Sequence, residues 1–382
     1  MNLKRLAIIS SHPIQYNAPL FRLLTQRARI KVKVFYTLEK KAVQFDRDFG
    51  KSIEWDLPLM EGYEWQYVSN GGSDKKDFWG VKNPTLEKEI QYWTPDAIMV
   101  YGWNYYSHLR AMHYFRKQAT VIFRGDSTLI DEEPGLKSFL RRKFLSWVYN
   151  GIDKALYTGE NNRAYFVATG LKSNQLKFGP HAVDNERFAE AAANFKDEAD
   201  ELKKSMGISA HEKVIVFAGK FQPKKNPLLL LKAFNELNPK QAHLVFVGNG
   251  ELESDIKNSA EKNSCIHILP FQNQLRMPLI YQLCDIFCLP SAGPGETWGL
   301  AVNEAMACRK AVLVSDKVGC AVDLVDDGQN GFIFRSGDMI DLKKKLSNLL
   351  FMNDTNVMGS KSYEKIQEYS YTKLAESIET LL

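Results

Sequence analysis

The sequence predicts an α/β fold made of two doubly wound domains, each built around its own parallel sheet. The chain has 382 residues, which indicates two domains at roughly 150 residues per domain. Short apolar runs rich in β-branched residues alternate with longer amphipathic stretches, the pattern of βαβ units with strands buried on both faces. This alternation is interrupted from Asn185 to Lys213, where Ala, Glu, Asp and Lys predominate.

Ten apolar runs are predicted to be strands. Those of the first half are Leu6–Ser10, Val32–Tyr36, Ala97–Tyr101, Thr120–Phe123 and Lys154–Tyr157. Those of the second half are Val214–Ala218, His243–Val247, Ile266–Leu269, Ile286–Leu289 and Ala311–Val314. Ligands of open parallel sheets bind beyond the carboxyl ends of the strands. The loops that follow these runs, facing a cleft between the domains, are therefore where chemistry is expected.

The interruption predicts the domain boundary. We expect an N-terminal domain over 1–184 and a C-terminal domain over 185–360, with 185–213 as exposed helix and linker. Residues 361–382 are predicted to be one further helix. Its apolar face would hold Tyr363, Ile366, Tyr369, Leu374, Ile378 and Leu381.

Composition excludes several classes of protein. Hydrophobic residues make up 45% and charged residues 25%, as in globular rather than disordered chains. The net charge of +5 includes no basic arm, so no nucleic acid partner is expected. The N-terminus lacks the apolar stretch of a signal peptide and no run approaches a membrane span, which favours a cytoplasmic protein. The five cysteines are sparse and odd in number, so buried free thiols are expected rather than disulfides.

The strongest functional signal is the segment Ser291–Ala307, SAGPGETWGLAVNEAMA. A Gly/Pro loop after a strand leads into a helix predicted to start near Gly299. Backbone N–H groups at a helix start, with the helix dipole, receive phosphates; here these would be the groups of Trp298, Gly299 and Leu300. Glu304 could then bind both hydroxyls of a ribose, and Glu296 could reach a sugar. The alternative is that Glu296 caps the helix and Glu304 is solvated.

A second signal is Phe217–Phe234, FAGKFQPKKNPLLLLKAF, which also joins a strand to an apolar helix. Lys220 and Lys225 lie in its loop. Two ammonium groups at a strand end can neutralise a diphosphate leaving group. The alternative is a solvated basic loop.

Over about residues 210–335, the order of the motifs along the chain resembles that of the family 4 glycosyltransferases, which are retaining enzymes of the GT-B fold. The resemblance rests on Gly219-Lys220 with Lys225, Gly248-Asn249-Gly250, Asp285, Pro290-Ser291, Glu296 to Glu304, and Gly328 to Gly331. It extends to His181–Phe188, which is similar to the family's domain-joining motif.

The resemblance implies roles for these residues. Gly219, Lys220 and Lys225 would bind the donor diphosphate, Glu304 the ribose and Glu296 the donor sugar. The C-terminal helix, 361–382, would cross back to brace the first domain. Three positions depart from the family pattern: Lys220 where Arg is usual, Asn226 where Gly is usual, and Cys320 within a Gly-Gly pair.

Candidates in the first domain also follow strands. The segment His12 to Tyr16 resembles that of bacterial surface-polysaccharide transferases, and His12 is a candidate catalytic and acceptor-binding residue, or a structural histidine. Asp126 is a catalytic candidate, or a cap of the following segment. Many relatives carry a His-Asp pair near Asp126, but this loop contains no His. Trp103 and Tyr105 could stack on an acceptor sugar, with Tyr16 nearby, or could pack in the core.

The segment Gly135–Asn150 is predicted to be an amphipathic helix. Its apolar face would hold Phe139, Leu140, Phe144, Trp147 and Val148, flanked by Lys137, Arg141, Arg142 and Lys143. The helix would either cover the core with a solvated basic edge or make a peripheral contact with the inner face of an anionic membrane.

The resemblance implies a transferase that moves a hexose from a UDP- or GDP-sugar to a glycan or lipid-linked acceptor in cell-surface polysaccharide synthesis. The nucleotide sugar is a co-substrate, and no cofactor is expected. No metal is expected either, because we find no Asp-x-Asp motif of the metal-binding kind. Two alternatives are a nucleotide-sugar epimerase of the same fold and a non-catalytic sugar-nucleotide-binding partner protein.

Overall fold

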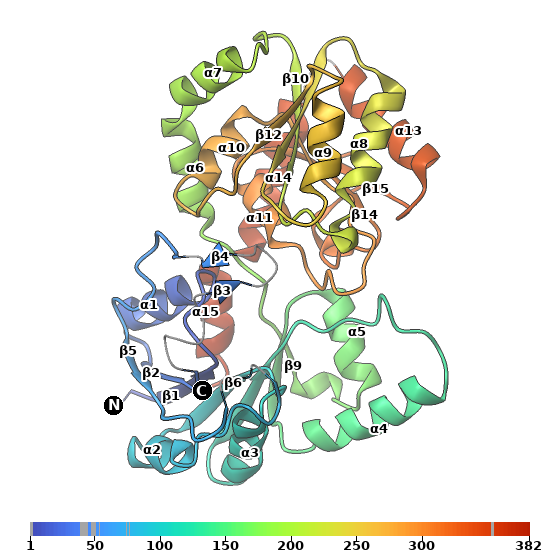
Figure 1. Cartoon of the computed structure of the whole chain (residues 1–382). Helices are drawn as coiled ribbons and strands as arrows, with labels where there is room; N and C mark the ends of the chain where they lie inside the picture. Colours follow the sequence, from blue (N-terminus) through green and yellow to red (C-terminus); the bar gives the residue numbers. More distant parts are fainter. Residues whose placement is uncertain are drawn as a thin grey trace. The chain divides into compact units, whose positions relative to one another are not determined.

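The computed structural model describes residues 3–38, 45–46, 51–52, 54–73, 75, 77–352 and 355–382. These residues form two compact units. The first contains the described residues up to His181 together with Tyr371–Leu382, and the second contains Ala182–Ser370. Each unit has its own buried apolar core and its own parallel sheet. Figure 1 shows the strands of both sheets.

The sheet of the first unit is parallel throughout, in the order β5-β2-β1-β6-β7-β8-β9. Its strands are β1 (Arg5–Ser10), β2 (Lys31–Tyr36), β5 (Glu64–Tyr67), β6 (Ala97–Tyr101), β7 (Thr120–Arg124), β8 (Lys154–Tyr157) and β9 (Leu176–Phe178). A separate antiparallel pair joins β3 (Phe45–Asp46) and β4 (Lys51–Ser52). The helices are α1 (Ala18–Arg27), α2 (Leu86–Tyr92), α3 (Tyr106–Phe115), α4 (Leu136–Tyr149), α5 (Glu160–Ala168) and α15 (Tyr371–Glu379).

The sheet of the second unit is also parallel, in the order β12-β11-β10-β13-β14-β15. Its strands are β10 (Lys213–Ala218), β11 (Ala242–Val247), β12 (Ile266–Leu269), β13 (Ile286–Leu289), β14 (Ala311–Ser315) and β15 (Gly331–Phe334). Its helices are α6 (Asn185–Asn194), α7 (Lys196–Ser205), α8 (Pro227–Leu237), α9 (Glu253–Ala260), α10 (Met277–Leu283), α11 (Leu300–Ala307), α12 (Ala321–Leu324), α13 (Met339–Phe351) and α14 (Asn356–Ile366).

The ten predicted strands are all present, with ends shifted by at most one residue, and the fold class is confirmed. In both sheets the strand order reverses direction beside the first strand, between β1 and β6 and between β10 and β13. Ligands of doubly wound sheets bind at this point, outside the carboxyl ends of the two strands. The loops after β1, β6, β10 and β13 are therefore the candidate functional loops.

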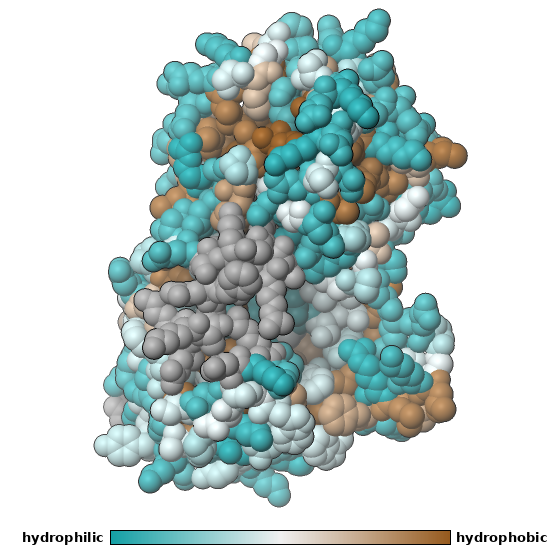
Figure 2. Space-filling view, viewed as in Figure 1, coloured by the Kyte–Doolittle hydropathy of each residue, from teal (hydrophilic) through white to brown (hydrophobic). Residues whose placement is uncertain are grey.

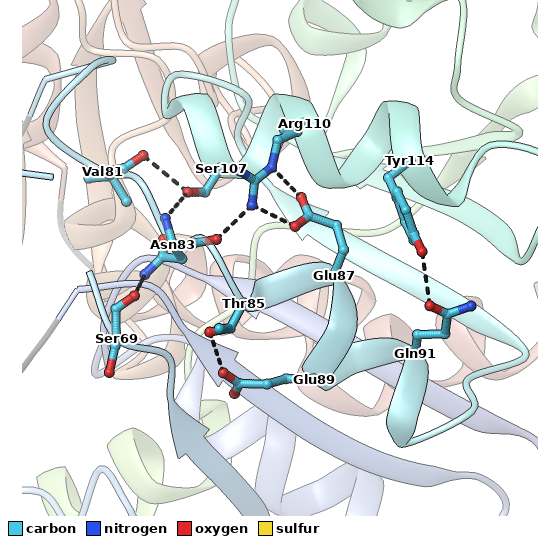
Figure 3. Close-up of polar contacts among 10 residues, drawn as sticks. All are labelled: Ser69, Val81, Asn83, Thr85, Glu87, Glu89, Gln91, Ser107, Arg110 and Tyr114. Carbon is cyan, nitrogen blue, oxygen red and sulfur yellow. Dashed lines mark hydrogen bonds and ion pairs between the residues drawn. The ribbon is translucent and has the colours of Figure 1, made fainter. Parts of the chain in front are cut away.

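A buried asparagine organises one end of the first sheet. The amide nitrogen of Asn83 donates to the backbone carbonyls of Val68 at 2.8 Å and Thr37 at 3.0 Å, residues that directly follow β5 and β2. Its backbone N–H donates to the hydroxyl of Ser107 at 2.7 Å, and Arg110 links its carbonyl to the carboxylate of Glu87 (Figure 3). These bonds attach α2 and α3 to the carboxyl ends of the strands, because buried backbone groups there require partners.

The interruption at 185–213 is helical, but it is not a linker. It forms α6 and α7, which pack on α10 and bury Phe188 and Ala199. The structure divides the chain between His181 and Ala182, and the expected boundary was at 184/185.

The prediction of one helix over 361–382 is wrong. Residues up to Ser370 belong to the second unit, where α14 packs on α11, while α15 belongs to the first. The chain is extended at Ser370, which forms a bridge with Val183, so the helical path breaks there. The predicted single face is consequently divided: Ile366 is buried in the second unit, and Leu374 and Ile378 are buried in the first.

An ion pair anchors the C-terminal helix within the first unit. Figure 1 shows α15 beside α1, at opposite ends of the chain. The guanidinium of Arg27 donates to both oxygens of Glu379 at 2.7 and 2.9 Å, and Arg29 adds a contact at 3.2 Å. The hydrogen bond from Arg27 lowers the pKa of Glu379. A carboxyl with a lowered pKa stabilises the folded state above its unfolded pKa and loses this effect as the pH falls.

We therefore expect Glu379→Gln to lower the free energy of unfolding by about 1–2 kcal/mol at pH 7. The difference from the parent protein should shrink as the pH falls below about 4.3, the usual pKa of a glutamate. It should vanish only below the lowered pKa of the folded state, where the carboxyl is protonated in both states. Thermal melting as a function of pH measures it. Glu376→Gln is the matched control, because Glu376 lies 3.9 Å from Arg27 and is half exposed. Equal melting of both variants at pH 7 would contradict the prediction.

Candidate functional site

The loops after β10 and β13 meet in the second unit. The backbone N–H of Ala292 donates to the carbonyl of Lys224 at 2.8 Å, which joins the two loops. Beside this bond, the ammonium of Lys225 lies 2.5 Å from an oxygen of Glu296. The hydroxyl of Ser291 donates to the same oxygen at 3.1 Å. Both charged groups were predicted from the sequence as ligand-binding residues, and the fold brings them into direct contact.

Burial makes this ion pair unusual. The side chain of Glu296 is 8% exposed and that of Lys225 is 20% exposed. Removing charges from water is costly, so buried pairs of this kind persist where each partner is compensated. Glu296 lies in the loop before α11, and none of its described hydrogen bonds is a cap of that helix. The alternative that Glu296 serves as a helix cap is therefore wrong.

Tight backbone packing shapes the loop around Glu296. The N–H of Gly319 donates to the carbonyl of Glu296 at 3.0 Å, and that of Cys320 donates to the carbonyl of Trp298 at 2.9 Å. A Cβ on Gly319 would lie 1.8 Å from the carbonyl oxygen of Thr297, so the position requires glycine. Cys320 is buried with a negative φ and needs no such freedom, which accounts for its place within the Gly-Gly pair.

Helix α11 begins at Leu300, with Gly299 as its N-cap at φ 102°. The first N–H groups of a helix have no partner within it and point along the axis toward any ligand. The helix start predicted near Gly299 is confirmed. The ring of Trp298, in contrast, is buried and its nitrogen donates to Asn303 at 2.8 Å. The ring of Trp298 belongs to the core.

Glu304 lies inside the unit and is only 3% exposed, so the alternative of a solvated helix residue is wrong. One of its oxygens accepts from the hydroxyl of Tyr281 at 2.8 Å and the other from the amide of Gln274 at 3.2 Å. Arg187 in turn donates to the amide oxygen of Gln274 at 3.1 Å. A carboxylate has about four acceptor positions, and bonds to both of its oxygens fix the orientation of Glu304.

The loop after β10 depends on close backbone approach. A Cβ on Gly248 would lie 2.1 Å from the carbonyl oxygen of Gly219. The absence of a side chain at Gly248 therefore allows the loops after β10 and β11 to approach this closely. Lys220 follows and is half-buried. Asn226, the last position before α8, adopts a left-handed conformation at φ 52°. Asparagine tolerates this region better than most residues, which explains how it can stand where the family has glycine.

In the first unit, His12 follows β1 and is half-buried, with its Nδ1 2.9 Å from the hydroxyl of Ser11. Helix α1 starts later, at Ala18 with Asn17 as its N-cap, so His12 does not cap it. The backbone carbonyl of Tyr16 accepts from the hydroxyl of Tyr371 at 3.0 Å, which ties this loop to α15.

Asp126 has a histidine partner from elsewhere in the chain. Nε2 of His181 lies 3.9 Å from a carboxylate oxygen of Asp126. The buried guanidinium of Arg124 donates to the carbonyls of Gly179 and Pro180 at 2.8 and 2.9 Å, which places the segment carrying His181 beside β7. Burial lowers the pKa of His181, and the hydrogen bond with Asp126 opposes this. Asp126 does not cap α4, which begins ten residues later at Leu136.

Trp103 and Tyr105 follow β6 and pack against neighbouring side chains. Trp103 lies against the core of the first unit, with its ring 5.6 Å from that of Phe144. Tyr105 is half-buried, and its ring meets that of His108 edge-on at 5.2 Å. Burial raises the pKa of Tyr105, which keeps its hydroxyl protonated.

The cysteines are free thiols, as predicted. Burial raises the pKa of Cys284 to about 12, so it is unreactive at neutral pH. Within the described ranges, no group of three or more His, Cys, Asp or Glu side chains is placed to hold a metal ion.

Sequence reasoning missed Gln274, Tyr281 and Arg124 as supporting residues. Gln274 lies in the loop after β12, so a search of every strand end would have found it. Tyr281 and Arg124 carry polar groups within apolar segments, and buried polar groups of that kind require partners. The identity of those partners depends on the tertiary structure.

With this geometry in view, the comparisons with known proteins are informative. Residues 198–373 match the family model described as Glycosyl transferases group 1. This segment, a little under half of the chain, is similar to the group 1 glycosyltransferases. It runs from within α7 to the start of α15 and includes Lys220, Lys225, Glu296 and Glu304.

Two curated glycosyltransferases match over about half of this chain. The sulfoquinovosyl transferase of Arabidopsis thaliana is 27% identical over 210 residues, 54% of this chain and 39% of that protein. The D-inositol 3-phosphate glycosyltransferase of Corynebacterium jeikeium is 29% identical over 221 residues, 54% of this chain and 51% of that protein. The chain thus matches about half or less of the length of these relatives.

The whole chain resembles solved structures. The crystal structure of HepE from Anabaena, in complex with UDP and glucose, superposes with a TM-score of 0.69 at 18% identity, over 100% of this chain and 99% of that chain. At this identity the likeness concerns the fold. The two units therefore have the GT-B fold, as predicted.

Proposed function

We propose that this protein transfers a sugar from a nucleotide-diphosphate sugar to an acceptor. The observation that carries the proposal is the contact between Lys225 and Glu296 at the strand-order reversal of the second sheet. It lies in the loop before α11, inside the segment that is similar to the group 1 glycosyltransferases. A cation and a carboxylate side by side offer one group for a phosphate and one for sugar hydroxyls.

The neighbouring residues fit the two parts of such a donor. The start of α11 and the ammonium groups of Lys220 and Lys225 would bind the diphosphate and stabilise the charge that develops as it leaves. Glu304, held by Tyr281 and Gln274, would accept hydrogen bonds from the ribose hydroxyls. Glu296 would contact the sugar. Lys225 would exchange part of its contact with Glu296 for the diphosphate when the donor binds.

The finer proposal is that a hexose is transferred from UDP or GDP with retention of configuration and without a metal cofactor. The acceptor would be a glycan or a lipid-linked glycan in cell-surface polysaccharide synthesis. The family resemblance supports retention, and the segment His12 to Tyr16 supports the acceptor class. HepE, solved with UDP and glucose, supports the nucleotide sugar. In the first unit, His12 and the pair of Asp126 and His181 would serve the acceptor.

A thermal-shift panel of UDP, GDP, ADP and their sugar conjugates tests the donor site. A ligand that binds the folded state at 100 times its Kd stabilises it by about 2.7 kcal/mol. We expect one nucleotide to raise the Tm by several degrees, and Lys220→Ala with Glu304→Ala to remove this rise. Lys240→Ala is the matched control, because Lys240 is exposed just before β11, at the amino-terminal end of the strands and away from the loops that follow them.

The outcomes are distinct. A shift that survives in the double variant would place the nucleotide elsewhere and contradict the assigned residues. The absence of any shift in well-folded protein would contradict the donor site itself. Conversion of a nucleotide sugar without any acceptor would instead identify an epimerase.

A further inference from the structure

Helix α4 carries two apolar faces, and one of them is exposed. Leu145, Val148 and Tyr149 are buried against the core of the first unit. The opposite face follows the helical spacing i, i+3, i+4, i+7, i+8 and i+11. We call it the outer stripe: Leu136, Phe139, Leu140, Lys143, Phe144 and Trp147.

The exposure of the outer stripe is high for large apolar side chains. The exposed fractions are 74% for Leu136, 55% for Phe139, 57% for Leu140, 46% for Phe144 and 54% for Trp147. Figure 2 shows hydrophobic side chains gathered over α4, at the lower right of the view. The alternative in which Phe139, Leu140, Phe144 and Trp147 face the core is therefore wrong for these four side chains. Contiguous exposed apolar surface of this kind marks an interaction site.

Basic residues accompany the stripe. Lys143 lies within it, with its ammonium 5.7 Å from the ring of Phe139, and exposed Lys137 borders it. Arg141 and Arg142, nearer the core, are paired with Glu132. The two lysines thus give the outer stripe its positive charge.

We propose that the outer stripe docks the protein on an anionic lipid surface, with the side chains of the stripe inserted among the lipid headgroups. Lysine is depleted at the centre of protein–protein interfaces, whereas its long stem lets the ammonium reach lipid phosphates while apolar neighbours insert. Phe and Trp beside Lys are the residues that amphipathic interfacial helices use. In the described part of the chain, no helix is long and apolar enough to span a bilayer.

Vesicle flotation of the full chain tests the proposal, with phosphatidylcholine alone or mixed with phosphatidylglycerol. We expect binding to the anionic vesicles that weakens as salt shortens the Debye length from about 10 Å at 0.1 M to about 3 Å at 1 M. Lys137→Glu with Lys143→Glu should weaken binding about thirtyfold or more. Leu136→Ser with Phe139→Ser and Leu140→Ser should weaken it at least about tenfold.

Matched controls separate the stripe from general surface effects. Ile340→Ser with Phe351→Ser removes two apolar side chains of α13 that are 78% and 87% exposed. Lys88→Glu with Lys117→Glu reverses two exposed lysines of the first unit. Both should bind vesicles like the parent protein. All variants should keep the parent melting temperature and nucleotide shift, so that failure here is distinguishable from failure of the donor site.

Two results would overturn the proposal. One is equal vesicle binding by the stripe and control variants. The other is a parent protein that ignores anionic vesicles but forms a dimer in solution that the apolar stripe variant does not form, which would assign the stripe to a second copy of the chain.

Discussion

Replacing Glu296 with alanine is expected to lower kcat by about 10²–10³-fold, the usual cost of removing a group that stabilises a transition state. Nucleotide affinity should change little, because Glu296 is assigned to the sugar and Lys225 stays in place for the diphosphate. Steady-state turnover and calorimetric titration of the nucleotide measure the two quantities separately. This split is what distinguishes an enzyme from a protein that only binds the nucleotide sugar.

Two further variants control this experiment. Lys225→Ala should weaken nucleotide binding as well as turnover. It removes the positive charge that would bind the diphosphate, and it leaves Glu296 buried without its cation. Glu261→Ala removes an exposed carboxylate after α9 and should leave both quantities unchanged. Normal turnover in Glu296→Ala would remove Glu296 from the chemistry.

Gly319→Ala is expected to destabilise the second unit by about 2–4 kcal/mol, because the new Cβ would overlap the carbonyl oxygen of Thr297. The backbone, rather than a flexible side chain, has to move. The Tm of this unit should fall by roughly 4–16 °C, given 2–4 °C per kcal/mol for a domain of this size. The nucleotide shift should also weaken, because Gly319 holds the carbonyl of Glu296.

Calorimetry of the variant with and without nucleotide measures both effects. Gly135→Ala is the control, since a Cβ there has nothing within 4 Å and should leave the melting profile unchanged. Melting of Gly319→Ala at the parent temperature would show that the loop can relax around the added methyl group, and would contradict the rigid backbone we assign to it.

Much of the fold could be predicted because the central strands are continuous apolar runs. Strands such as Ile286–Leu289 are buried on both faces, and that burial dictates their composition. The strands of the two large sheets that were missed, β5, β9 and β15, are edge strands of three or four residues. Whether these segments form strands depends on pairing with the neighbouring strand rather than on the hydrophobic pattern of their own residues.

Within the candidate site, the sequence predicted those residues that can be identified within one strand–loop–helix segment. Glycine-rich loops, Lys225 and Glu296 could be identified because local spacing places them at a helix start. Their mutual contact could not, since it joins loops that are 71 residues apart along the chain.

By itself, the sequence determined the α/β class, the central strands and the charged residues of the donor loops, because these depend on burial and on short-range spacing. Only the tertiary structure placed His181 beside Asp126, supplied Tyr281 and Gln274 to Glu304, and turned the apolar stripe of α4 outward. Each of these depends on which distant segments become neighbours. An amphipathic pattern specifies that a helix has faces, and only packing decides which face is covered.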